Sequence, residues 1–449
     1  FFKQKTAYEI GVRLVGSEMC IRDRADLEDY ALFYNMGYEL DNSLNLYSFG
    51  SYSKREGNSG GFYRRAQDSR NVLALYPDGF LPQIETDVED YSFALGLEGE
   101  TGDWTWDVST NYGRNDFALG VVNSLNTSLG ATSPTEFDNG ALVYDQFIVN
   151  GDASTTLDLG LPDDVFFTLG AEYRHESYKI EQSEEASYIT ALDSNGNPIA
   201  AGGAQVLSGF GPESVTDESR HNVALFVEFD TYLTDNWNMV LASRYEDYSD
   251  FGNTFTSKLA TRYSVNENLS LRGAISTGFR APTVGQANVS NVQTNLSDGV
   301  LRDSALLPPT NPVAVQLGGT ELQPEESQSY TFGAVYTIGD LFLTVDYYNI
   351  QVEDRISQSE KITLSQADKD TLSAAGVPNV EGLAQVSFFT NDFDTTTQGV
   401  DVVANYTADI LGGSSTFSLA YNWNETEVTK FSDITGEFKV KRLEEDLPN

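Results

Sequence analysis

Apolar and polar residues alternate one by one over many stretches of this chain. Between residues 255 and 265, the apolar residues Phe255, Leu259 and Tyr263 fall on odd positions, whereas Lys258 and Arg262 fall on even ones. The same alternation recurs in residues 104–112, 222–230, 269–279 and 416–423. A period of two predicts β-strands that have one apolar face and one polar face.

The chain carries about 14 such segments of roughly 10 to 15 residues each. A ten-residue strand rises ~33 Å, and a tilt of ~45° leaves ~23 Å along the membrane normal. That height matches the ~25 Å apolar band of an outer-membrane barrel. We therefore predict an all-β fold, an antiparallel transmembrane β-barrel. Alternation by itself also allows a large soluble β-sandwich or barrel with one polar face.

The segments between the predicted strands alternate in length. Short polar turns are predicted at residues 40–43, 99–103, 160–164, 233–236, 265–268, 338–341 and 410–415. Long stretches are predicted at residues 57–87, 116–142, 182–219, 280–325 and 353–385, with one short connection at 249–254. Short periplasmic turns and long extracellular loops are the topology of an outer-membrane barrel.

Charged residues agree with this interpretation, because they fall on the polar phase of their strands. Arg244, Lys258, Arg262 and Arg272 are examples. A Lys or Arg that faces lipid at mid-depth costs about 2–4 kcal/mol. We therefore expect the polar face to line the lumen of the barrel.

Composition narrows the function classes. With 27 Lys and Arg against 67 Asp and Glu, the net charge is −40, which argues against a nucleic-acid partner. Two His and one Cys exclude a multi-histidine metal site and a disulfide framework, so we expect no metal and no cofactor. Residues 57–61 fit G-x-S-x-G, but a polar loop follows them instead of the helix that a nucleophile elbow needs. We assign no catalytic residue and expect no enzyme.

The first 24 residues differ from the remainder of the chain. They contain the only Cys, Cys20, and lack the apolar core of a secretory signal. The stretch KQKTAYEI followed by LVGSEMCIRDR resembles translated sequencing-adapter DNA, and a divergent N-terminal extension is the alternative. We expect residues 1–24 to be a non-native leader and residues 25–449 to form the barrel.

Three motifs occur in a fixed order in the second half of the chain. They are Gly278-Phe279-Arg280-Ala281-Pro282, then Pro324-Glu325 with Ser327, and then Gly399 within TQGVD. The first two lie about 45 residues apart, and that pair is the specific part of the pattern. In this order and spacing they resemble the barrel of TonB-dependent outer-membrane receptors, over roughly residues 28–449.

The resemblance implies a barrel of about 22 strands whose lumen is plugged by an N-terminal domain. It implies a receptor in the outer membrane of a Gram-negative bacterium, embedded in lipid and lipopolysaccharide. Such a receptor takes up a scarce bulky solute, such as a ferric siderophore, cobalamin or a glycan, with energy from the inner-membrane TonB complex. The plug and the final strands are absent from this sequence, so we expect a partial barrel. The alternatives are a passive porin-type channel and a soluble extracellular glycan-binding β-protein.

The chemical properties of the motif residues suit structural roles in the barrel. Pro282 lacks an N–H group and ends a strand where pairing stops, and Pro324 and Glu325 start the next strand after a long loop. Gly278 permits close approach of a neighbouring backbone, and Gly399 suits a bulge or a close-packing site. Contact with a ligand or with the plug is the alternative role.

One long loop contains a candidate ligand site. Phe62, Tyr63, Arg64, Arg65 and Tyr76 combine aromatic rings with cations in an otherwise acidic chain. In an external loop, this set of residues could contact an anionic small-molecule ligand. A cluster that only holds the loop together is the alternative.

Overall fold

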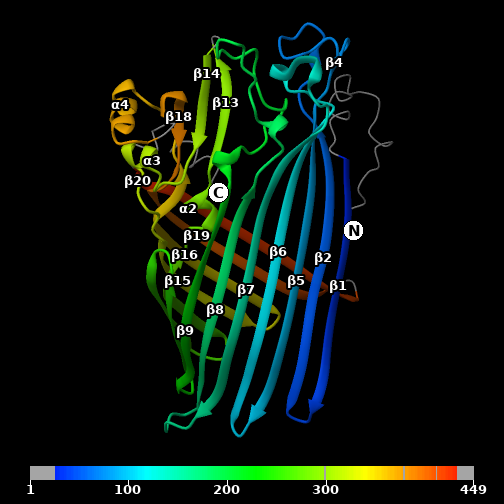
Figure 1. The fold of residues 1–449 in the computed structure, drawn as a ribbon. Helices are drawn as coiled ribbons and strands as arrows, with labels where there is room; N and C mark the ends of the chain where they lie inside the picture. Colours follow the sequence, from blue (N-terminus) through cyan, green and yellow to red (C-terminus); the bar gives the residue numbers. More distant parts are fainter. Residues whose placement is uncertain (1–25, 298–299, 378–379, 411, 432–449) are drawn as a thin grey trace.

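A single antiparallel sheet of 14 strands dominates the computed structural model, which describes residues 26–297, 300–377, 380–410 and 412–431 (Figure 1). Each strand pairs with the next one along the sheet. The strands are β1 (Asp26–Asp41), β2 (Leu44–Gly60), β5 (Gln83–Thr101), β6 (Trp104–Val122), β7 (Phe137–Leu157), β8 (Val165–Glu181), β9 (Thr216–Thr234), β10 (Trp237–Tyr248), β11 (Gly252–Ser264), β12 (Leu269–Arg280), β15 (Glu325–Ile338), β16 (Leu341–Gln358), β19 (Phe389–Ile410) and β20 (Gly413–Phe431). The leader predicted at residues 1–24 and the end of the predicted barrel lie outside the described residues.

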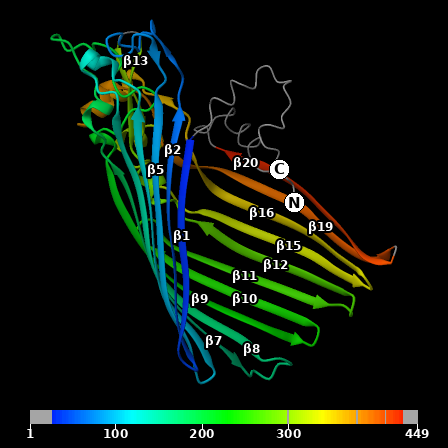
Figure 2. The ribbon, with the colours of Figure 1, turned by 90° about the vertical axis from the view of Figure 1, so that its right-hand side faces the viewer.

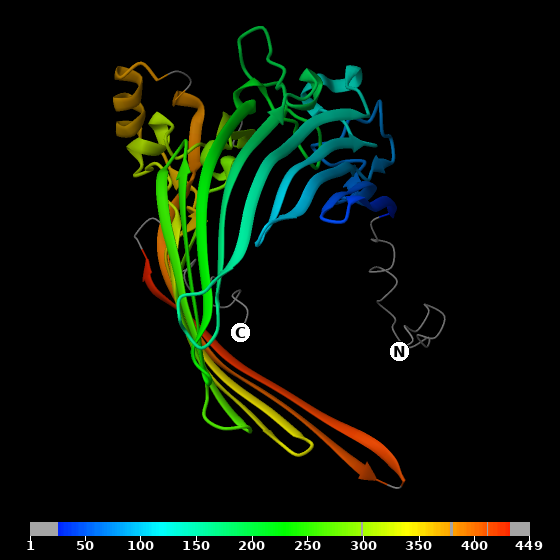
Figure 3. The same cartoon turned by 90° about the horizontal axis from the view of Figure 1, so that it is seen from below.

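The sheet is strongly curved and open, as Figures 2 and 3 show from two directions. β1 and β20 form its edges, and neither has a second strand partner among the described residues. The predicted all-β antiparallel architecture is confirmed. No described helix is long and apolar enough to cross a membrane.

The two rims of the sheet differ as the sequence predicted. Short turns join strands at one rim, for example residues 42–43, 102–103 and 235–236. Long segments join them at the other rim, which is uppermost in Figure 1, except that residues 249–251 join β10 to β11 there. We call these the short-turn rim and the long-loop rim.

Ten of the 14 strands are longer than predicted, whereas β10, β11, β12 and β15 have the predicted length. The longest is β19 with 22 residues, whereas the alternation predicted roughly 10 to 15. β2 continues to Gly60 and β5 begins at Gln83, well inside the stretch predicted as a loop. Charged pairs hold this extension, since the Lys54 ammonium lies 2.9 Å from Glu56 and 3.0 Å from Asp87. β2 and β5 stay paired here although polar side chains lie on both faces, and this loss of alternation made the segment look like a loop.

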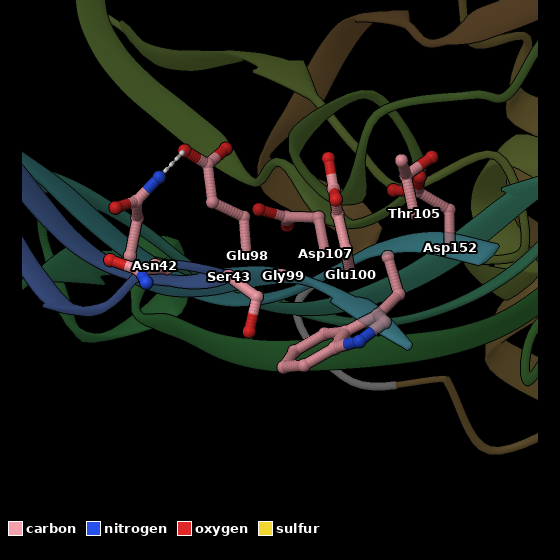
Figure 4. Close-up of a pocket in the computed structure, with 10 residues that line it drawn as sticks. Asn42, Ser43, Glu98, Gly99, Glu100, Thr105, Asp107 and Asp152 are labelled. Carbon is pink, nitrogen blue, oxygen red and sulfur yellow. Dashed lines mark hydrogen bonds between the residues drawn. The ribbon is translucent and has the colours of Figure 1, made fainter. Parts of the chain in front are cut away.

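Strand register separates the side chains into two faces, because residues directly opposite each other share a face. One row contains Glu98, Asp107, Asp152, Gly170, Phe226, Arg244 and Thr256. Figure 4 shows Glu98, Asp107 and Asp152 on the side toward which the sheet curves, so we call this the inner face. An apolar row on the outer face contains Phe229, Leu241, Leu259, Ile275 and Tyr330.

The long segments build two groups above the long-loop rim, which touch where the Ser290 hydroxyl donates to the Glu213 carbonyl oxygen at 2.7 Å. The polar-linked group comprises residues 61–82, 123–136 and 182–215, with β3 (Arg64–Arg65), β4 (Gly79–Phe80), η2 (Thr127–Thr132), η3 (Glu185–Ser187) and η4 (Pro212–Ser214). The apolar-cored group comprises the described parts of residues 281–324 and 359–388. Its elements are α2 (Val284–Asn288), β13 (Asn291–Ser297), β14 (Val300–Leu306), α3 (Pro312–Gln316), β17 (Ile362–Thr363), α4 (Gln366–Ala374), η5 (Val380–Gly382) and β18 (Leu383–Ser387).

The apolar-cored group contains the largest buried core of the described chain. β13, β14, β18 and β17 form a four-stranded sheet in that order, in which β14 and β18 are parallel. Val313, Ala314, Val386 and Phe388 are fully or almost fully buried in its core. The two segments therefore fold together as one unit, although they are far apart in the sequence.

Candidate ligand site on the long-loop rim

Residues 61–82 fold into a compact hairpin on the long-loop rim. β3 pairs with β4, which places Arg64 opposite Phe80. The Tyr63 hydroxyl donates to the carbonyl oxygen of Asp78 at 2.8 Å and closes the hairpin. The loop therefore presents fixed positions instead of a flexible chain.

Two of the five predicted ligand residues support this hairpin from inside. Arg64 is buried, and its Nη1 donates to the carbonyl oxygen of Phe62 at 2.7 Å. Burial lowers the pKa of the Arg64 guanidinium below its usual value. The Tyr76 hydroxyl donates to the Ser124 carbonyl at 3.1 Å, and its ring stacks on Phe80. Tyr76 thus ties the hairpin to the neighbouring loop.

The other three residues face solvent. Phe62 is 85% exposed and Tyr63 is 56% exposed. Arg65 is exposed, and it has no carboxylate partner among the described residues. By contrast, Arg70 in the same loop holds Asp68 through two hydrogen bonds of 2.9 and 2.8 Å, which lower the pKa of that carboxyl far below its usual range. Phe62, Tyr63 and Arg65 are the groups that the hairpin can offer to a ligand.

The structure brings the first two sequence motifs together. Arg280, the last residue of β12, lies opposite Glu325, the first residue of β15. Its guanidinium makes a two-pronged pair with the Glu325 carboxylate, with an Nε–Oε2 distance of 2.9 Å. Glu325 is buried and also accepts from the backbone N–H of Ile356 at 2.7 Å. Both segments of the apolar-cored group are therefore anchored at this carboxylate.

The remaining motif residues lie close to this anchor or in the sheet below it. A Cβ atom on Gly278 would lie 2.8 Å from the Ser327 hydroxyl, and one on Gly399 would lie 2.5 Å from the Trp423 carbonyl oxygen. Gly399 stands in regular register, so it occupies a close-packing site and no bulge. Phe279 makes an edge contact with Tyr248. Ala281 and Pro282 follow β12 directly, and Pro324 directly precedes β15.

Sequence reasoning missed the buried arginine beside this anchor. The Arg220 Nε lies 2.6 Å from Glu176, and its Nη1 donates to the carbonyl oxygen of Pro282. The same guanidinium lies over the Tyr248 ring, 5.2 Å from its centroid. Arg220 sits two residues before Asn222 on the polar phase of β9, and that phase was the signal that could have found it.

A second, acidic hollow lies at the opposite end of β5 from the hairpin (Figure 4). Glu98, Glu100, Asp107 and Asp152 line it near the short-turn rim. The Tyr47 hydroxyl donates to Asp107 at 2.8 Å. The G-x-S-x-G stretch belongs to neither site, because Ser59 lies inside β2 opposite Ile84 with no helix after it.

The fold and the motif pair together define the class of protein. The family profile described as "TonB dependent receptor-like, beta-barrel" matches residues 24–443, and the chain belongs to this family. A probable TonB-dependent siderophore receptor, PirA of Acinetobacter baumannii, is 23% identical over 273 residues, which cover 59% of this chain and 32% of the relative.

Solved structures show the same fold. The siderophore receptor PirA from Acinetobacter baumannii superposes with a TM-score of 0.58 at 15% identity, covering 91% of this chain and 54% of that one. A ferric enterobactin receptor, PfeA of Pseudomonas aeruginosa, solved as a Q482A mutant with enterobactin, gives a TM-score of 0.58 at 14% identity over 90% and 53%. The RagAB peptide transporter gives 0.58 at 13% identity over 91% and 48%. The chain thus spans between about a third and about half of these relatives.

Proposed function

We propose that this chain is the barrel part of an outer-membrane receptor that takes up a scarce bulky solute with energy from the inner-membrane TonB complex. Family membership supports the receptor class. Among the solutes that the family takes up, a ferric siderophore is our first choice, and cobalamin or a glycan is the alternative. The names of the relatives PirA and PfeA support this order.

The location in the outer membrane rests on the outer face of the sheet. Leu241, Leu259, Ile275 and Tyr330 lie side by side there, and each is more than 40% exposed. A continuous apolar surface of this kind suits lipid and lipopolysaccharide and does not suit water. A soluble glycan-binding protein has no need of it, so partition of the chain into buffer instead of a detergent phase would contradict this placement.

The single observation that carries the ligand class is the exposed trio Phe62, Tyr63 and Arg65. An aromatic surface next to a cation that has no carboxylate partner among the described residues suits a large anionic ligand that has flat rings. The net charge of −40 repels anions elsewhere on the molecule, so a local cation acts as a specific contact.

Equilibrium dialysis of the detergent-solubilised chain against ferric enterobactin, cyanocobalamin and a maltodextrin tests this proposal. We expect the iron complex to be retained and the substitution Arg65→Gln to weaken its binding about tenfold, the loss of one charged hydrogen bond. Arg70→Gln is the matched control, because Asp68 already holds that arginine. Equal weakening by both substitutions would show a general charge effect and would refute the assigned contact.

A further inference from the structure

The chain has two histidines, and the sheet places them opposite each other. His175 lies on β8 and His221 on β9, and the antiparallel register of these strands makes the two residues direct partners. His175 is five residues from Gly170 and His221 is five residues from Phe226, so both lie on the face opposite to that inner row, which is the outer face. A count of two histidines excludes a site of three or four, but it does not exclude a site made by this pair.

The backbone geometry brings the two side chains as close as cross-strand partners come. The His221 N–H donates to the Ser249 hydroxyl at 3.0 Å, and the His221 carbonyl oxygen accepts from the Ser249 N–H at 2.9 Å. Both backbone groups of His221 therefore point away from β8, which makes His175 and His221 a non-hydrogen-bonded pair. The Cα atoms of such a pair lie ~4.5 Å apart, and their side chains stand side by side. Two imidazoles at this spacing can bind one ion through bonds of ~2.0 Å.

Both imidazoles are available to a ligand. His221 is exposed and His175 is half-buried, and neither ring has a hydrogen-bond or ion-pair partner among the described residues. The His221 ring lies 6.3 Å from the Tyr173 ring, measured between centroids. Because His221 is exposed, a change of rotamer can exchange this contact for a bond to an ion. The fold thus fixes the backbone of the pair and leaves its nitrogen atoms unused.

The pair lies where the outer face changes from apolar to polar. On β9, the next outer-face residues toward the short-turn rim are Val223 and Leu225, which are exposed apolar side chains. Toward the long-loop rim they are Ser219 and then Asp217, whose carboxylate lies 3.0 Å from the Lys179 ammonium. Water and dissolved ions therefore reach the pair from its polar side.

We propose that His175 and His221 bind one divalent transition-metal ion, Cu²⁺ or Zn²⁺, on the outer face of the sheet. Imidazole nitrogens suit these ions, whereas Mg²⁺ and Ca²⁺ prefer oxygen ligands. Among the described residues, no group of three or more His, Cys, Asp or Glu side chains is placed to hold a metal ion. The protein therefore supplies two ligands and water supplies the others, which makes an open site. The site lies outside the hairpin of residues 61–82, so this inference does not rest on the proposed solute.

Cu²⁺ binding to the full detergent-solubilised chain tests the proposal. Cys20→Ser is made in every protein so that no thiol competes for the metal. Titration calorimetry should show one tight Cu²⁺ per chain, and electron paramagnetic resonance should show splitting by two imidazole nitrogens. His175→Gln and His221→Gln should each weaken binding about tenfold, because each leaves a single imidazole. Two independent histidines would instead bind two ions, and each substitution would remove one ion without weakening the other. That result would overturn the proposal.

A relocated histidine provides the matched control. His221→Gln/Gln67→His keeps two histidines in the chain but moves one of them to an exposed position in the hairpin. We expect this variant to bind Cu²⁺ no more tightly than His221→Gln does. Binding as tight as in the parent chain would show that the register of β8 and β9 has no part in the site. A resonance spectrum with a single nitrogen in the parent chain would also refute the pair.

Discussion

The two groups of loops on the long-loop rim are held together by different forces. In the apolar-cored group, segments from two loops bury Phe388, Val386 and Ala314 in a common core. In the polar-linked group the apolar core is small, and buried polar side chains connect the loops. Asn126 donates to the carbonyl oxygens of Ala186 and Ile189, both at 2.9 Å.

The difference shows that a loop layer can be ordered without a large core. Hydrogen bonds are directional and fix a geometry, whereas apolar contacts supply more free energy per side chain. The hairpin that carries the candidate ligand contacts belongs to the polar-linked group. The position of this hairpin should therefore depend on a few specific hydrogen bonds. The stability of the apolar-cored group should depend on how completely side chains fill its core.

The largest expected effect comes from the apolar core. Phe388→Ala should lower the local unfolding free energy of the apolar-cored group by about 3–5 kcal/mol, because it leaves a cavity in a fully buried site. Hydrogen exchange of the β14 and β18 amides measures this. Val315→Ala on α3, which is 53% exposed, should leave the exchange unchanged. Similar exchange in the two variants would mean that this core does not hold the group.

A single polar side chain should have the next largest effect. Asn126→Ala removes the side-chain donor of the Ala186 carbonyl and one of two donors of the Ile189 carbonyl, which still accepts from the Gly203 N–H, and should destabilise the polar-linked group by about 1–3 kcal/mol. Limited proteolysis within residues 182–215 measures the opening of these loops. The control is Gln67→Ala, an exposed position in the same group. If β14 exchange also rises in Asn126→Ala, the two groups are coupled and the comparison fails.

The Arg280–Glu325 pair, which joins the sheet to the apolar-cored group, should contribute less free energy than either of these side chains. Arg280→Met should cost about 1–2 kcal/mol, less than a fully buried pair, because the Arg280 side chain is 53% exposed and solvent screens it. A double-mutant cycle with Glu325→Gln isolates the pair. A coupling energy near zero would contradict the assigned anchor.

The smallest effect should come from the start of α4. The Ser365 hydroxyl donates to Asp368 and lowers the pKa of that carboxyl below its usual 3.8. The bond stabilises α4 above that pH and is lost as the pH falls below it. Amide exchange of α4, corrected for intrinsic rates, should therefore show a weak acid destabilisation. Asp368→Asn should abolish that pH dependence. If the pH profile of α4 exchange is the same in this variant, Asp368 does not cap the helix.

Alternation predicted the sheet well because the residue types within each strand segment show which side chains lie on which face. Residues 255–265 show it, since Leu259 lies on the outer face and Lys258 on the inner one, as predicted. The loop layer could not be predicted in the same way. β14 finds its parallel partner β18 in a different loop, and no local pattern encodes that pairing.

The candidate site was predicted only as a group. The sequence identified a cationic aromatic loop, but it could not separate Arg64 from Arg65. That separation depends on the pairing of β3 with β4, which buries one arginine and leaves its neighbour in solvent. Arg280 and Glu325 were named from a motif, yet their contact became visible only through the register of β12 and β15.

The extension of the strands beyond the apolar band has a consequence for how such a receptor changes over generations. β2 and β5 remain paired without a register break from Leu44 opposite Gly99 to Gly60 opposite Gln83. An insertion between Gly60 and Gln83 lengthens only the exposed hairpin, whereas a one-residue insertion within either strand would move every later side chain to the wrong face. Insertions and deletions can therefore accumulate at the tip, while the paired strands accept only substitutions.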